Sequence, residues 1–323
     1  MTSVGPDAGR VQPDEVAAAV RFAAALKAAV GDAVEVRDGL LDELLVCILA
    51  EGHILIEDLP GVGKTTLARA LARGVGLELS RIQCTADLLP ADVVGANIYN
   101  RRDERFEFRP GPVFANVVLV DEINRASPKT QSGLLECMQE RRVTVDLHTH
   151  ELARPFVVLA TQNPVEFEGT YPLPEAQVDR FMARVTLGYP SPAAEAEMLR
   201  GHESGDRTDA IRAVGGPGDL LDAQDAARRV HTSDALRRYV VDLLGATRSD
   251  PRAELGASPR SGLMLLRAAK ARALLCGRDH ALPDDVQALA PLVLGHRIVP
   301  AAEALETTGE AIVTDALAAV PAL

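Results

Sequence analysis

The fold of this chain is decided by one stretch, Asp58-Leu59-Pro60-Gly61-Val62-Gly63-Lys64-Thr65. A short β-rich run at residues 53–56 precedes it, and an amphipathic helical pattern with Leu67, Ala68 and Leu71 on one side follows it. Glycines allow backbone N–H groups to close around phosphate oxygens, and the N-terminus of the following helix adds its positive end. The order of strand, glycine-rich loop and helix predicts a nucleotide phosphate site and disfavours a chance glycine-rich turn.

Two side chains of this loop point to the same ligand. Lys64 is a cation in the first turn of a helix, where it opposes the helix dipole unless an anion is bound there. Thr65 is placed to offer its hydroxyl to a Mg²⁺ ion that bridges the outer phosphates. The first position of the pattern G-x-x-x-x-G-K-[S/T] is Asp58 here instead of Gly. The residues predicted to bind the nucleotide are Asp58, Pro60, Gly61, Val62, Gly63, Lys64, Thr65 and Thr66.

Polar residues follow two further apolar strands. Residues 117–120 form a continuous apolar run that ends in Asp121 and Glu122, at the strand end where open α/β sheets bind ligands. We predict that Asp121 holds the Mg²⁺ and that Glu122 orients the attacking water or accepts its proton. The run 156–160 leads to Asn163, which is expected to hydrogen-bond the γ-phosphate and the water. Taken singly, the acid pair could be a solvated turn, and Asn-Pro is a turn signal.

Two arginines complete the candidate site. Arg180 closes a short helical pattern, where it would favour the helix C-terminus, but in a ring of subunits it could reach a neighbour's nucleotide as an arginine finger. Arg260 follows Ser258 and Pro259, which read as an N-cap and a first helical residue. A cation in that first turn suggests contact with a phosphate across a domain cleft, against the alternative of a solvated side chain.

The chain divides into three parts by pattern. Residues 1–12 are predicted to be a disordered tail, 13–188 an α/β nucleotide-binding core and 189–323 a helical lid. The core is predicted to have helices from residue 13 onward and at 40–50, together with strands and two hairpins. After Pro190 the sequence shows no further strand pattern. The expected strands are 53–56, 77–83, 117–120, 156–160 and 184–187, the hairpins 95–110 and 141–154, and the later helices 192–202, 219–230, 233–247, 259–276 and 283–294, with a loop at 201–218.

Assembled in order, these motifs resemble those of the MoxR family of AAA+ ATPases. The resemblance covers nearly the whole chain from about residue 14 and rests on the runs 57–68, 111–116, 121–126, 129–136, 160–164, 168–177 and 256–260. It implies an AAA+ core with a parallel sheet of order 5-1-4-3-2 and helices on both faces, an all-α lid, Mg-ATP and a hexameric ring. It also implies chaperone-like remodelling of partner proteins, often with von Willebrand factor A domains, and makes both hairpins candidate partner contacts. The family's Val-Gly-Gln near the adenine is Val30-Gly31-Asp32 here.

The composition limits the expected cellular location of the protein and the class of partner that it can bind. Lys and Arg number 34 against 46 Asp and Glu, which gives a net charge of −12, and 47% of the 323 residues are hydrophobic. This acidity weighs against nucleic acid as the main partner, although a local basic patch stays possible. No apolar stretch reaches the ~18–20 residues of a membrane span, and no signal peptide pattern is present, so a cytoplasmic protein is expected. Each of the four cysteines, Cys47, Cys84, Cys137 and Cys276, is predicted to be a buried free thiol.

The sequence is compatible with four functions. A ring-forming, chaperone-like ATPase fits the full set of motifs best. The alternatives are an ATPase motor subunit of a metal-chelatase type of complex, a nucleic-acid-dependent motor, and a scaffold that binds ATP without hydrolysis. His148 and His150 lack an acid or Cys at ligand spacing, which favours a polar turn over a metal site.

Overall fold

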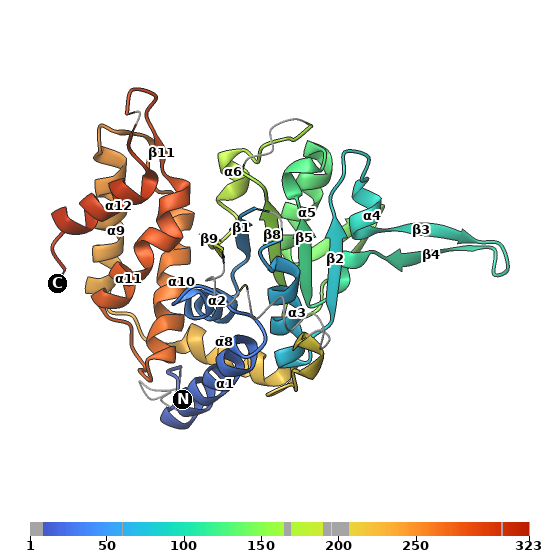
Figure 1. Cartoon of the computed structure of the whole chain (residues 1–323), viewed down its shortest axis with the longest axis horizontal. Helices are drawn as coiled ribbons and strands as arrows, with labels where there is room; N and C mark the ends of the chain where they lie inside the picture. The colour runs from blue at the N-terminus through green and yellow to red at the C-terminus, as the bar shows by residue number, and fades with distance from the viewer. Residues whose placement is uncertain are drawn as a thin grey trace, which may run out of the picture.

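The centre of the protein is a five-stranded parallel sheet with the order β2-β5-β8-β1-β9 (Figure 1). The computed structural model describes residues 9–59, 61–164, 169–189, 195, 207–304 and 306–322. When the five strands are numbered along the chain, this order is 5-1-4-3-2, which confirms the predicted sheet. The strands are β1 (Ile54–Glu57), β2 (Leu79–Gln83), β5 (Val117–Asp121), β8 (Val157–Gln162) and β9 (Ala183–Val185).

Alternate residues of the strands face two separate hydrophobic cores, because side chains along a strand point to opposite faces. Ile54 and Ile56 lie in one core with α1, α2 and α3, whereas Leu55 lies in the other with α4 and α5. Helices therefore cover both faces of the sheet. The helices of the core are α1 (Pro13–Gly31), α2 (Leu40–Leu49), α3 (Lys64–Val75), α4 (Pro90–Val94), α5 (Pro128–Glu140) and α6 (Glu175–Val178).

The C-terminal part is a group of helices that shares its core with the N-terminal helices. Buried residues of α8, α10 and α11 belong to the same apolar cluster as those of α1 and α2. In Figure 1, α9, α10, α11 and α12 lie at the left end of the molecule, whereas α8 lies beside α1, against which it packs. The helices are α8 (Pro217–Arg229), α9 (Asp234–Ser249), α10 (Pro259–Leu275), α11 (Pro283–Leu294) and α12 (Gly309–Ala319).

Some details of this region differ from the sequence pattern. A short antiparallel pair, β10 (Ala253–Leu255) and β11 (Val299–Pro300), joins loops that precede α10 and follow α11, although no strand was expected there. Helix α12 was not predicted either. Cys276 is exposed, so that prediction was wrong: it is the C-cap of α10, where the helix ends, while Cys47, Cys84 and Cys137 are buried. Of the predicted helix 192–202, only residue 195 is among the described residues, and residues 201–206 of the predicted loop also lie outside them.

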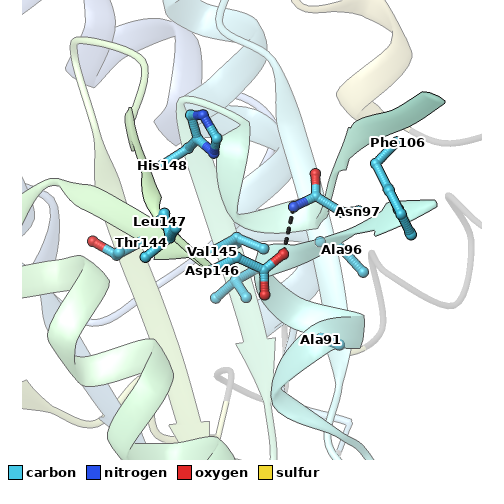
Figure 2. Close-up of a pocket in the computed structure, with 11 residues that line it drawn as sticks. Ala91, Ala96, Asn97, Phe106, Thr144, Val145, Asp146, Leu147 and His148 are labelled. Carbon is cyan, nitrogen blue, oxygen red and sulfur yellow. Dashed lines mark hydrogen bonds between the residues drawn. The ribbon is translucent and has the colours of Figure 1, made fainter. Parts of the chain in front are cut away.

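The two predicted hairpins are present, and they contact each other. They are β3 (Gly95–Asn100) with β4 (Arg105–Pro110) and β6 (Arg142–Val145) with β7 (His148–Glu151). Asn97 Nδ2 donates to Asp146 Oδ2 at 2.6 Å, and the rings of Phe108 and His150 stack with centroids 3.9 Å apart. A cavity of about 610 Å³ lies between the hairpins and α4, with Leu147 on its rim (Figure 2). The β3–β4 hairpin projects away from the body at the end opposite the helical group (Figure 1).

A buried histidine, His53, directly precedes β1 and bonds to two other segments of the core. His53 Nδ1 accepts from the Val158 N–H at 3.0 Å, so its Nε2 carries the proton and donates to the Met138 carbonyl at 3.0 Å. Burial, the largest cause, lowers the pKa of His53 from 6.5 to about 4. The neutral ring is therefore favoured in the folded chain.

We expect His53 to lower the free energy of unfolding as the pH falls. Below about pH 6.5 the unfolded chain binds a proton that the folded chain refuses, so between pH 7 and pH 4.5 the free energy of unfolding should drop by about 2–3 kcal/mol from His53 alone. Gln can keep both hydrogen bonds without titrating. Urea unfolding at the two pH values should show a smaller drop for His53→Gln, while His148→Gln, at an exposed hairpin position, should lose stability like the wild type. Equal drops in all three proteins would contradict the assignment.

Candidate nucleotide site

The glycine-rich loop joins the end of β1 to the start of α3. Gly61 and Gly63 have φ angles of +86° and +94°, and Gly63 is the N-cap of α3. A Cβ atom at either position would meet nothing within 4 Å, so the left-handed backbone, and not lack of space, is what requires glycine there. Lys64 begins the helix, and its Nζ donates to the main-chain oxygen of Asp58 at 2.6 Å.

A cavity of about 340 Å³ opens between this loop and the ends of the neighbouring strands. It brings together most of the residues that the sequence singled out and adds three that it did not, Arg81, Gln83 and Thr161. Burial, the largest cause, lowers the pKa of Lys64, and the carboxylates of Asp58, Asp121 and Glu122 partly offset this effect. The lining residues are Gly61, Gly63, Lys64, Thr65, Thr66, Arg81, Gln83, Asp121, Glu122, Thr161 and Asn163.

The two acids at the end of β5 have different surroundings. Asp121 is buried, and its Oδ2 accepts from Arg81 Nε at 2.6 Å. Glu122 stands in the left-handed region with φ +57°, and its N–H donates to Thr161 Oγ1 at 3.0 Å. Because of this backbone conformation, the Glu122 side chain does not follow the alternation of side chains between the two faces of the sheet. Two adjacent acids can therefore both face the cavity and do different work.

Strand β2 supplies two partners for these acids. It pairs with β5 so that Gln83 lies opposite Asp121. Gln83 Nε2 donates to Glu122 Oε2 at 3.1 Å, and Arg125 Nε lies 3.3 Å from the same oxygen. The signal for Arg81 and Gln83 in the sequence is weak, because alternate polar residues on a strand usually mean a solvated face. What makes them part of the site is the pairing of β2 with β5.

The two predicted arginines lie outside the cavity that this chain forms around the loop. Arg260 Nη1 is 3.9 Å from Asp179 Oδ2, a long and partly exposed contact. Arg180 follows the same aspartate in the chain, and its Nε is buried without a hydrogen-bond partner in the structure. Pro60 lies outside the described residues. The structure thus gathers the loop, the acid pair and Asn163 around one cavity, and places Arg180 and Arg260 outside it.

Asp179 is held by a buried arginine that the sequence did not single out. The side chain of Arg297 is 1% exposed, and its Nε donates to Asp179 Oδ1 at 2.9 Å. Its other nitrogens donate to the main-chain oxygens of Phe181, Met182 and Val293. Burial, the largest cause, lowers the pKa of Arg297 to about 10, and Asp179 offsets part of this effect. Arg297 therefore ties the end of α11 to the chain between α6 and β9.

Comparison with known proteins identifies the family to which this fold belongs. Residues 53–183 match the ATPase family associated with various cellular activities (AAA), and residues 245–316 match the AAA lid domain. The Chaperone MoxR1 of Mycobacterium tuberculosis is 44% identical over 278 residues, which cover 83% of this chain and 73% of that protein. Protein MoxR of Methylorubrum extorquens is 34% identical over 87% of each chain. The chain belongs to the MoxR family of AAA+ ATPases.

Other relatives of this MoxR-family chain extend the likeness over nearly its whole length. The Bacillus subtilis protein YeaC, which is uncharacterized, is 50% identical over 85% of this chain and 87% of its own. A crystal structure from Cytophaga hutchinsonii, provisionally described as an ATPase, is 39% identical and superposes with a TM-score of 0.89 over 96% of this chain and 97% of that one. The predicted family and the predicted fold are thus confirmed. Within the described ranges, no helix is both long and apolar enough to cross a membrane.

Proposed function

We propose that the chain binds Mg-ATP in the 340 Å³ cavity and hydrolyses it to ADP and phosphate. The observation that carries this proposal is the meeting of Lys64 and Thr65 with Asp121 and Glu122 around one cavity. The test is phosphate release from Mg-ATP together with equilibrium binding of the same nucleotide. A folded wild-type chain that binds no adenine nucleotide would overturn the proposal.

The roles follow from the position of each group. The amides around Gly61 and Gly63 and the Lys64 ammonium would bind phosphate oxygens, since they form the positive end of α3. Thr65 and Asp121 would hold the magnesium ion, which when bound neutralises charge on the outer phosphates. Glu122 would take the proton of the attacking water, and Asn163 would position that water. The remaining proposed nucleotide contacts are Pro60, Val62, Thr66 and Arg260, whereas Asp58, which the sequence also suggested, does not line the cavity.

We further propose a hexameric ring in which Arg180 acts on the nucleotide of a neighbouring subunit. Family membership supports the ring, and the position of Arg180 outside its own chain's cavity supports the action in trans. Arginine fingers contribute about 10³–10⁵-fold to phosphoryl transfer. Arg180→Ala should therefore abolish most turnover while leaving nucleotide binding intact.

Mixing two inactive variants tests this arrangement directly. A subunit with Arg180→Ala keeps Glu122, and a subunit with Glu122→Gln keeps Arg180, so mixed rings contain some complete sites. We expect phosphate release in the mixture to exceed that of either variant alone. A mixture that is no more active than its components, although it co-assembles on size exclusion, would contradict the action in trans.

The work done with the hydrolysis energy is proposed to be remodelling of partner proteins, often with von Willebrand factor A domains. The name of the 44% identical relative, a chaperone, supports this class of function. Exposed apolar residues on the hairpins give a surface for such contacts, with Phe106 at 70% and Leu147 at 94% exposure. Affinity capture of the Glu122→Gln variant with ATP should retain a partner. A proposed cytoplasmic location fits the same role.

A further inference from the structure

Asp58, the residue that replaces the first glycine of the loop pattern, bonds to a part of the chain far from the loop. Its Oδ2 accepts from the N–H groups of Leu187 at 2.6 Å and Gly188 at 2.9 Å. Its Oδ1 accepts from the Leu59 N–H at 3.0 Å. The carboxylate is therefore fully engaged by backbone donors, and it is not among the groups that line the cavity. A contact with nucleotide does not explain why an acid stands here.

The partner segment is the exit of the last strand of the sheet. β9 ends at Val185, Leu187 is buried in the core, and Gly188 has a φ of +75°. In the sequence, the helices of the C-terminal part follow this turn. Hydrogen bonds to an ionised carboxylate are about twice as strong as neutral ones. Asp58 thus fixes the place where the polypeptide leaves the nucleotide-binding core.

The same residue also touches the phosphate-binding cation. The Lys64 ammonium donates to the main-chain oxygen of Asp58 at 2.6 Å. A phosphate in the cavity would compete for this ammonium, because an anion attracts it more strongly than a carbonyl does. Asp58 would then lose its bond to Lys64 while its carboxylate still holds Leu187 and Gly188. One residue therefore links the occupancy of the loop to the exit of β9.

We propose that Asp58 is a positioning residue that couples phosphate binding at Lys64 to the Leu187–Gly188 segment. The proposal rests on the proposed binding of ATP. Its consequence is that nucleotide binding changes the protection of the Leu187 and Gly188 amides, and that this response requires an acceptor at residue 58. A residue that only stabilised the turn would affect stability but would not carry this response.

Hydrogen exchange of the full-length protein, read by mass spectrometry for peptides that span 184–189, tests the coupling. Without nucleotide, Asp58→Ala should speed exchange of the two amides about tenfold, because each loses a charged acceptor. With Mg-ADP, the wild type should change its exchange in this segment and Asp58→Ala should not. Asp58→Asn, which retains one oxygen for both amides, should restore most of the response. Asp92→Ala is the matched control, since Asp92 also accepts a backbone N–H, that of Leu89 at 2.9 Å, but far from this exit.

The outcomes separate this proposal from the proposed function. Failure of the wild type to bind Mg-ADP, measured by calorimetry, would overturn the function, whereas unchanged exchange in Asp58→Ala without nucleotide would overturn the contact itself. A nucleotide response in Asp58→Ala equal to that of the wild type would overturn the coupling. Exchange of the β8 amides checks that each variant is folded. If Asp58→Ala does not fold, Asp58→Ser takes its place with the same expectation, because its shorter side chain cannot reach both amides.

Discussion

Replacing Glu122 by Gln is expected to leave Mg-ATP binding intact and to lower turnover by about 10²–10⁴-fold, the usual contribution of a general base. Gln has nearly the same shape, and its amide oxygen can still accept from Gln83, which now donates at 3.1 Å. The left-handed backbone of residue 122 is held by its own N–H bond to Thr161, which the substitution does not touch. The change therefore removes a proton acceptor and little else. Phosphate release and equilibrium binding of ATP measure the two effects separately.

A second acid on the same part of the chain provides the control. Glu140 lies at the end of α5 and pairs with Arg142 at 3.1 Å on the surface. Glu140→Gln loses one carboxylate and one ion pair, as Glu122→Gln does, and should keep wild-type turnover. Undiminished hydrolysis by Glu122→Gln would show that this carboxylate is not the base.

Replacing Arg297 by Met is expected to lower the free energy of unfolding by about 3–5 kcal/mol, the cost of removing one partner from a buried ion pair. Met has a similar length but donates no hydrogen bond, so the Asp179 carboxylate loses its closest cation and four main-chain oxygens lose a donor, those of Asp179, Phe181, Met182 and Val293. Asp179 keeps its contact with Ser261 Oγ at 3.3 Å and the longer one with Arg260. Urea unfolding at pH 7 measures the loss.

An exposed arginine gives the matched comparison. Arg237 pairs with Asp234 at 2.6 Å on the surface of α9, where both side chains are mostly in water. Arg237→Met should change the free energy of unfolding by no more than about 0.5 kcal/mol. Similar small losses in both variants would mean that Arg297 is not the anchor between α11 and β9 that its contacts indicate.

Part of the candidate site could be predicted because its residues are neighbours in the sequence. The loop from Gly61 to Thr65 and the acid pair after β5 carry their roles in residue type and spacing. The position of Asn163 followed from one rule, that parallel strands end at the same edge of a sheet. These residues do line one cavity.

The rest depended on pairings that no short stretch of sequence contains. Arg81 and Gln83 meet the acids only because β2 lies beside β5 in register. Arg297 was missed because a charged residue is normally exposed, and because its ion-pair partner, Asp179, lies 118 positions earlier in the chain. The β10–β11 pair was missed because each of its strands is too short to show a periodic pattern in the sequence.

The ion pair between Arg81 and Asp121 has a consequence for the order in which ligands arrive. The carboxylate proposed to hold magnesium already has a cation 2.6 Å from its Oδ2, so a metal ion that binds alone competes with a guanidinium and gains less net attraction. A metal ion that comes with a triphosphate brings a new anion to which the released guanidinium can turn. For the proposed site we therefore expect weak binding of free divalent metal and tighter binding of metal and nucleotide that enter as a single complex.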